Sequence, residues 1–238
     1  MKKIIFIIMF VFLQADNLKI MTEIFPPYQY KENGKLVGIS VDIVKSIQKK
    51  IDNHSKINVY SWIRANEILD KFKNTMLFSM MRIPERENKY IWLGPIDKIE
   101  IVFFKRKDSN ISLNSLEDAK KVHKIGVIRR FASCEFLLDK NFKNLDIIYG
   151  HDDQNIKKLL RGRIDLWPSS KKPTLYELKQ KHLLDKIVPI KNVVLIRGYL
   201  YIAFNKNTDK KIINKWKKAF EELKKEGIIE KIKQKYRL

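Results

Sequence analysis

Short apolar runs alternate with amphipathic segments along almost the whole chain. Runs that are rich in β-branched and aromatic residues are typical of β-strands. Such runs lie at 18–23, 57–62, 75–81, 99–105, 124–128, 145–149 and 199–204. Because these predicted strands alternate with helical patterns, the sequence favours an α/β fold with mainly parallel sheets flanked by helices.

Residues 40–51 predict an amphipathic helix. Val44, Ile47 and Ile51 fall on one face of that helix. Asp42 falls in its first turn, where a carboxylate interacts favourably with the helix dipole. This helix should therefore pack one apolar face against a sheet.

A capping box and an apolar stripe predict two further helices. Ser115 stands three residues before Asp118, a spacing typical of a helix start. Near the C-terminus, apolar residues at helical spacing form one stripe. They are Ile212, Ile213, Trp216, Phe220 and Leu223, and Gly227 is expected to end that helix.

Two apolar strands, 99–105 and 199–205, lie nearly a hundred residues apart. The segment between them contains strands and helices of its own. If both strands cross from one sheet to another, the intervening segment is a second lobe inserted into the first.

The N-terminus has the pattern of a secretory signal peptide. Two lysines precede the apolar run Ile4–Leu13, which is too short to span a bilayer, and Ala15 suits cleavage. The alternative is a buried N-terminal strand or helix. Residues 1–15 are thus predicted to be removed. Asp16 follows, so no cysteine is placed for a lipid anchor, and the single cysteine, Cys134, excludes an intrachain disulfide.

The formal net charge is +22, which would suit a nucleic-acid partner. The excess is mostly lysine scattered over helix faces, as in 210–227, which is typical of solvated surfaces. Export also argues against nucleic acid, so we expect no such partner. Attraction to an acidic membrane surface or to an anionic solute stays open.

Five segments, in order and at suitable spacing, carry a resemblance to a known family. They are 22–47, 82–88, 115–130, 157–167 and 220–236. From about residue 18 to its end, the chain resembles the bacterial extracellular solute-binding proteins of family 3, which serve polar amino acid ABC transporters.

The resemblance implies a two-lobed periplasmic binding protein-like fold of type II, with two crossing hinge strands. It places residues 16–102 and 199–238 in one lobe and residues 103–198 in the other. One small solute would bind between the lobes, which move by hinge closure. The implied protein is a periplasmic monomer without a cofactor that delivers its solute to the membrane permease of an ABC transporter.

The first predicted site residue is Arg86, which matches the arginine that holds the solute's α-carboxylate in the family. A guanidinium offers two parallel N–H donors to a carboxylate. The alternative is an ion pair with Glu85 or Glu87. Ile83 occupies the family's threonine position, and Arg82 either adds a second cationic contact or points to solvent.

The loop around the double proline supplies further candidates. Phe25 matches the family residue that stacks on the solute, with core packing as the alternative, and Tyr28 flanks the same rigid loop. Glu23 precedes the loop, where it would meet a cationic group of the solute or the Lys-rich surface. Trp62 and Arg64 sit at a strand-to-helix turn that faces the cleft in the family, Trp62 being the stronger candidate for cleft lining.

In the second lobe, Arg130 and Ser133 fall on a loop that holds the solute carboxylate in the family. Ser170 stands where many amino-acid binders carry an aspartate that pairs with the ammonium. Without it a buried ammonium lacks charge compensation, which argues against a standard α-amino acid. Trp167 either lines the cleft or packs in the core.

Nothing in the sequence indicates catalysis or a metal site. The four histidines lack metal-ligand spacing, and no phosphate loop or nucleophile elbow occurs. Two alternatives to a transport receptor stay open. One is a dehydratase-like enzyme on the same scaffold, for which no acidic catalytic residue is identifiable, and the other is a soluble sensor that feeds a membrane kinase.

Overall fold

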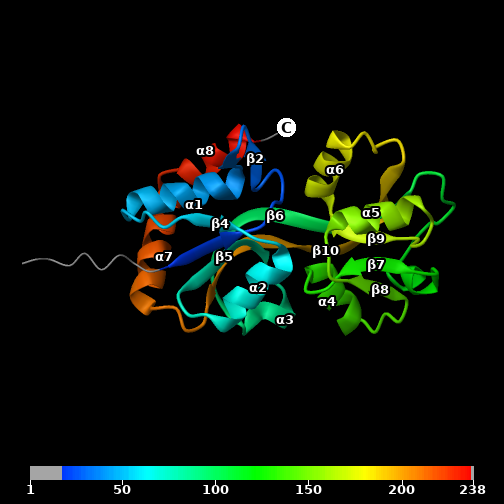
Figure 1. The fold of residues 1–238 in the computed structure, drawn as a ribbon, viewed down its shortest axis with the longest axis horizontal. Coiled ribbons are helices and arrows are strands. Elements are labelled where there is room, and N and C mark those ends of the chain that lie inside the picture. The colour runs from blue at the N-terminus through cyan, green and yellow to red at the C-terminus, as the bar shows by residue number, and fades with distance from the viewer. Residues whose placement is uncertain (1–17, 237–238) are drawn as a thin grey trace, which may run out of the picture.

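The computed structural model describes residues 18–236 of the chain. Figure 1 shows two α/β bodies side by side, joined by two long strands, β6 (Tyr90–Arg106) and β10 (Ile187–Asn205). The predicted signal peptide, residues 1–15, lies outside the described residues.

We call the two bodies lobe 1 and lobe 2. Besides the long strands, lobe 1 contains β1 (Lys19–Thr22), β2 (Tyr30–Glu32), β3 (Lys35–Val37), α1 (Ile39–Lys50), β4 (Ile57–Val59), α2 (Trp62–Lys71), β5 (Thr75–Met81), α3 (Pro84–Glu87), α7 (Lys210–Lys225) and α8 (Ile228–Lys235). Lobe 2 contains a short 3₁₀ helix (Glu117–Lys121), β7 (Ile125–Ile128), α4 (Ala132–Asp139), β8 (Leu145–Ile148), α5 (Asp152–Leu160), β9 (Trp167–Ser170) and α6 (Lys171–Gln180).

One six-stranded sheet, in the order β4-β1-β5-β10-β6-β9, continues from lobe 1 into lobe 2. Strands β4, β1 and β5 are parallel, whereas β10 is antiparallel to both β5 and β6. A second parallel pair, β7 and β8, lies in lobe 2. The predicted parallel pairing is thus found within each lobe, and the connecting strands add antiparallel pairs.

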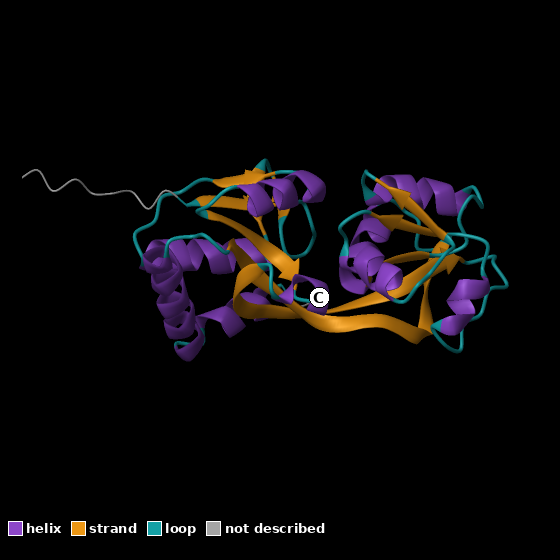
Figure 2. Ribbon diagram, turned by 90° about the horizontal axis from the view of Figure 1, so that it is seen from below, coloured by secondary structure: helices purple, strands orange, loops and turns teal. Residues whose placement is uncertain are grey.

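The two connecting strands are longer than the sequence predicts. β6 has 17 residues and β10 has 19, and Figure 2 shows long strands continuing from one body into the other. In residues 90–98 only every third position is buried, and the segment includes Gly94, so it does not form an apolar run. The predicted lobe boundaries, at 102/103 and 198/199, fall within these strands and stay a prediction.

Helices cover both faces of the sheet in lobe 1. Ile20 and Phe204 share one core with α1 and α7, while Met21 and Leu77 face α2 on the other side. Strands that are covered on both faces are apolar at successive positions, so they appear in the sequence as continuous hydrophobic runs. All five residues of the predicted C-terminal stripe are buried in α7. Gly227, with φ +72°, separates α7 from α8 as expected.

The predicted capping box is present at the entry to lobe 2. The hydroxyl of Ser115 accepts a hydrogen bond from the N–H of Asp118 at 3.3 Å. In return, the carboxylate of Asp118 accepts one from the N–H of Ser115 at 3.0 Å. The helix that follows is a single 3₁₀ segment rather than a longer α-helix.

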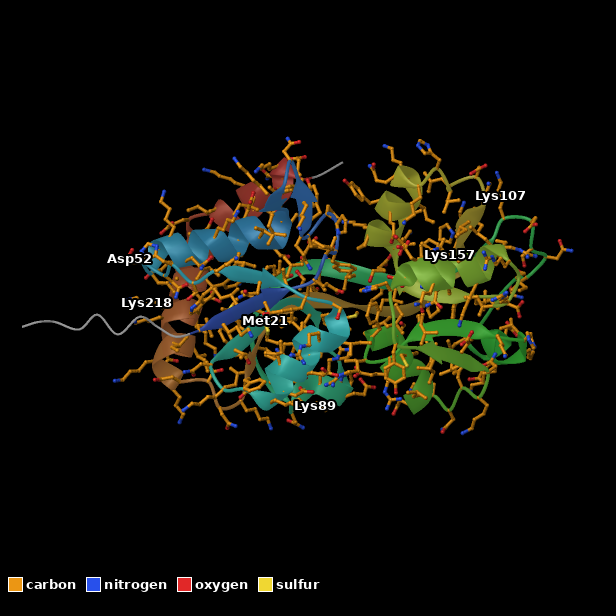
Figure 3. All side chains as sticks on the ribbon, viewed as in Figure 1. Met21, Asp52, Lys89, Lys107, Lys157 and Lys218 are labelled. Atoms are coloured by element: carbon orange, nitrogen blue, oxygen red, sulfur yellow. The ribbon has the colours of Figure 1, made fainter. Side chains whose placement is uncertain are left out.

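The basic surface is dispersed. Figure 3 shows Lys89, Lys107 and Lys218 at the periphery of the lobes and Lys157 on α5, while Met21 lies inside lobe 1. This distribution agrees with lysines on solvated faces. Within residues 18–236, the helices are too short or too polar to cross a membrane.

Candidate functional site

A cavity of about 60 Å³ lies where the two lobes meet. This is roughly four times the space that one water needs, so the cavity suits a small solute. Lobe 1 contributes Glu23, Phe25, Trp62, Ser79, Met81 and Arg86, the long strands contribute Ile99, Ile101 and Leu200, and lobe 2 contributes Phe131, Ala132, Ser133, Asp152, Ser169 and Ser170. The lining therefore combines aromatic and aliphatic walls with a few charged and hydroxyl groups.

Six of the predicted site residues line this cavity: Glu23, Phe25, Trp62, Arg86, Ser133 and Ser170. The chain reaches it from loops and element ends that lie far apart in the sequence. Phe25 follows β1, Trp62 opens α2, Ser133 lies in the first turn of α4, and Ser170 ends β9.

Arg86 lies at the interface of the lobes, with only 2% of its surface exposed. It follows β5 in the short helix α3. Its Nε and Nη2 both lie 2.8 Å from the carboxylate of Glu135 in α4. Nη1 donates to the carbonyl of Met81 at 3.2 Å, and Nη2 donates to the carbonyl of Arg130 at 2.6 Å. The guanidinium also faces the Trp62 ring, 5.5 Å from its centroid.

Arg86 thus forms an ion pair, as the alternative prediction held, but with a different partner. The sequence pointed to Glu85 or Glu87, which are its neighbours in the chain. The partner is instead Glu135, on the opposite lobe. Such a pair forms only when the lobes are closed, and sequence distance gives no signal for it.

Further contacts hold the lobes together beside the cavity. The indole N–H of Trp62 donates to the carbonyl of Arg130 at 2.9 Å, and its ring meets Phe131 edge-on at 5.9 Å. The Arg130 side chain forms an ion pair with Asp70, which also accepts a hydrogen bond from the Tyr90 hydroxyl at 2.6 Å. Arg130 therefore does not line the cavity. Its carbonyl and its side chain both bind residues of lobe 1 and stabilise the closed arrangement of the lobes.

Two predicted cations lie outside the cavity. Arg82 pairs with Glu87 and stacks near Trp92 and Tyr201, at 5.8 and 5.3 Å from their ring centroids. The Arg64 side chain is largely exposed, with Glu67 at 3.6 Å. The sequence left open whether Arg82 contacts the solute or points to solvent. In the structure it neither lines the cavity nor stays free. Aromatic rings and a carboxylate on the surface bind it instead.

Two predicted aromatic residues pack in the core. Tyr28 is fully buried, and its hydroxyl donates to the carbonyl of Lys98 at 3.2 Å. Trp167 is 1% exposed and packs on Phe104 at 5.5 Å. Its indole N–H donates to the carboxylate of Asp152 at 3.1 Å. Trp167 thus takes the core alternative and contacts the site through Asp152.

Two carboxylates, one from each lobe, are perturbed by their surroundings. Burial raises the pKa of Glu23 from 4.5 to about 8, with Asp152 adding to the rise and Arg86 opposing it. Burial also raises the pKa of Asp152 from 3.8 to about 7, with Glu177 adding to the rise and the hydrogen bond from Trp167 opposing it. Glu23 therefore keeps its proton at neutral pH, and Asp152 keeps it in part, unless a cation approaches them.

Sequence reasoning missed Asp152 as a site residue. Its local pattern, Asp152-Asp153 at the start of an amphipathic segment, is typical of a helix N-terminus. Only the tertiary fold shows that Asp152 reaches the cavity while Asp153 pairs with Lys181. Ser79 and Ser169 were likewise not singled out, because serines are common in any strand or turn.

The described residues contain no group of three or more His, Cys, Asp and Glu side chains that could hold a metal ion. The arrangement instead offers donors for an anionic group at Arg86, acceptors for a cationic group at Glu23 and Asp152, and apolar walls between them.

Comparison with known proteins agrees with this architecture. The chain is 26% identical over 216 residues to a probable amino-acid-binding protein, YxeM, of Bacillus subtilis, covering 88% of this chain and 79% of the relative. A histidine kinase sensor domain with similarity to periplasmic binding proteins superposes with a TM-score of 0.81 at 19% identity, covering 93% and 96% of the two chains. An ancestral arginine-binding protein bound to arginine superposes with a TM-score of 0.78 at 26% identity, covering 92% and 97%.

These similarities confirm the two-lobed periplasmic binding protein-like fold that the sequence predicted. The model of one family matches residues 18–238, which is nearly the whole chain. The protein belongs to the bacterial extracellular solute-binding proteins, family 3.

Proposed function

We propose that this protein is a periplasmic receptor that captures a small carboxylate-bearing solute, an amino acid or a related compound, and delivers it to the permease of an ABC transporter. The observation that carries the proposal is the cavity lined from both lobes, with the Arg86 guanidinium at the interface. The matching family and the amino-acid-binding relative support it.

Arg86 is the proposed carboxylate anchor. One oxygen of Glu135, Oε2, lies 2.8 Å from both Nε and Nη2 of the guanidinium, which is the edge that a solute carboxylate would occupy. The Glu135 side chain is 23% exposed, so it can move into solvent when a solute takes its place. Ser133, in the first turn of α4, lies in the same lining and adds a hydroxyl at a helix N-terminus, which favours anions.

In this proposal the permease recognises the closed, solute-bound conformation of the protein. A ligand shifts an open–closed equilibrium only through contacts that differ between the two states. Phe25 and Trp62 on lobe 1, and Phe131 and Ser133 on lobe 2, line one cavity, so a solute touches all four only when the lobes meet. The protein acts in this proposal as a binding protein without catalysis.

The test is a thermal-shift screen of small carboxylates and amino acids, followed by calorimetry on the hits. We expect Arg86→Gln to weaken binding by about ten- to a hundredfold, since hydrogen bonds to charged groups contribute about 1.5–3 kcal/mol. The matched control is Arg64→Gln, because Arg64 lies outside the cavity and should leave affinity unchanged.

A second variant separates binding from folding. Glu135→Gln removes the carboxylate that competes for the guanidinium, so we expect tighter binding of a carboxylate-bearing solute. A purely structural role for the Arg86–Glu135 pair predicts the opposite, weaker binding in both variants. Unchanged affinity in Arg86→Gln would refute Arg86 as the anchor.

A further inference from the structure

Glu23 and Asp152 face the same cavity from opposite lobes. Glu23 follows β1 in lobe 1, and Asp152 opens α5 in lobe 2. Within residues 18–236, the Glu23 carboxylate forms no hydrogen bond or ion pair, and Asp152 accepts one hydrogen bond, from the neutral indole of Trp167. The two carboxylates therefore lie in the cavity without a cationic partner.

The nearby cations are already engaged. Arg86 binds Glu135 and two backbone carbonyls. Lys181 binds Asp153 and Glu177, behind the start of α5. Arg86 in the cavity lining is neutralised by its ion pair with Glu135, so the two formal negative charges in the lining, on Glu23 and Asp152, are uncompensated. A guest with positive charge is the natural complement of this excess.

We propose that Glu23 and Asp152 together form a subsite for cationic groups, ammonium or guanidinium, and that the protein selects small solutes with a net positive charge. The subsite rests on the proposed function, since it belongs to the same cavity. A cation held between the two carboxylates contacts both lobes at once, so it also favours closure.

This subsite removes the objection raised by Ser170. The sequence argued against an α-amino acid because no carboxylate stands at that position. In the structure Ser170 and Asp152 line the same cavity, so Asp152 supplies the missing negative charge from a different element. Asp152 and Asp153 both lie in the first turn of α5, where either could interact with the helix dipole. Asp153 binds Lys181 at the surface, so a helix-start role alone does not explain why Asp152 faces the cavity.

The raised pKa values of Glu23 and Asp152 agree with this role. Glu23 faces Asp152 and Arg86, and Asp152 faces Glu177, Asp153 and the indole of Trp167. A cation binds the ionised carboxylates, so binding near pH 7 must release protons from the pair. Affinity for a cationic solute should therefore rise as pH increases from 6 to 8.

The experiment compares two nearly isosteric pairs by calorimetry, L-lysine with L-norleucine and L-arginine with L-citrulline. We expect the charged member of at least one pair to bind tenfold or more tightly than its neutral partner. Titration in two buffers with different heats of ionisation should show proton release on binding at pH 7. Glu23→Gln and Asp152→Asn should each weaken binding of the charged member at least tenfold more than binding of its neutral partner, whose α-ammonium is its only cationic group.

The matched control is Asp153→Asn, which removes a neighbouring carboxylate outside the cavity and should leave the preference intact. Both site variants remove a carboxylate whose ionised form is disfavoured by burial, so they should fold. Equal affinity within both pairs, or a preference that survives both variants, overturns the cationic subsite while the receptor function stands. If no amino acid or carboxylate binds the wild type, the proposed function and the subsite both fail.

Discussion

The buried Glu23 carboxyl predicts a stability that falls as pH rises. Its pKa is about 8 in the folded protein, raised mainly by burial, against 4.5 for an ordinary glutamate. Between these two values the folded state keeps a proton that the unfolded state has lost. The resulting contribution to stability is fully present below pH 4.5 and is lost as pH rises through 8.

The magnitude follows from the size of the shift. One pKa unit corresponds to about 1.4 kcal/mol, so the window from pH 5 to pH 8 spans at most about 4 kcal/mol. Because Glu23 is partly exposed, solvent screening reduces this figure, and we expect roughly 2–3 kcal/mol. Glu23→Gln should remove that part of the pH dependence and stabilise the protein at pH 8.

The assay is urea denaturation of wild type and Glu23→Gln at pH 5 and pH 8, with the free energy of unfolding obtained by linear extrapolation. The two proteins should differ little at pH 5 and by about 2–3 kcal/mol at pH 8, since the shift acts only where glutamate would otherwise ionise. Glu32→Gln, at an exposed position in β2, is the control and should follow the wild type. Parallel pH dependence in wild type and Glu23→Gln would refute the reasoning.

Two further predictions concern the scaffold and its closure. Gly38→Ala should cost more than about 2 kcal/mol in urea denaturation, because φ is +125° and a Cβ would lie 2.4 Å from the carbonyl oxygen of Tyr28. Gly34→Ala, at φ +75° with open space around it, should cost only about 1 kcal/mol, and equal costs would contradict the steric explanation. Asp70→Asn removes the ion pair between Asp70 and Arg130 across the lobes. Both side chains are about one-third exposed, so the loss should destabilise the closed state by at most about 1 kcal/mol. Small-angle scattering should then show a larger mean radius of gyration, and an unchanged radius would exclude the pair as a closure contact.

The sequence predicted those features that depend on local burial. The apolar run at 75–81 is β5, buried at every position because helices cover both faces of the sheet. The stripe through Trp216 and Phe220 follows the helical period because one face of α7 is buried. Hydrophobic periodicity reports which side of an element meets the core, and it did so reliably here.

The features that depend on several elements at once were harder to predict. The sequence predicted β6 only over 99–105, because its first half is buried only at every third position and contains Gly94. Asp152 has the pattern of a helix start, and only the tertiary fold brings it to the cavity. Arg82 and Arg86 lie four residues apart with similar neighbours, yet one binds surface aromatic rings and the other reaches lobe 2. Spacing along the chain does not distinguish these outcomes.

The contacts of Arg86 bear on which part of a solute determines selectivity. Glu135 already occupies its guanidinium across the cleft, so a solute carboxylate exchanges one ion pair for another. The net gain from that exchange is smaller than the gain at an unoccupied guanidinium, since an existing interaction is lost. Glu23 and Asp152 form no ion pair among the described residues, so a cation there displaces protons rather than an existing ion pair. In the proposed receptor, the carboxylate would therefore orient the solute at Arg86, while the cationic group would determine which solutes favour the closed state.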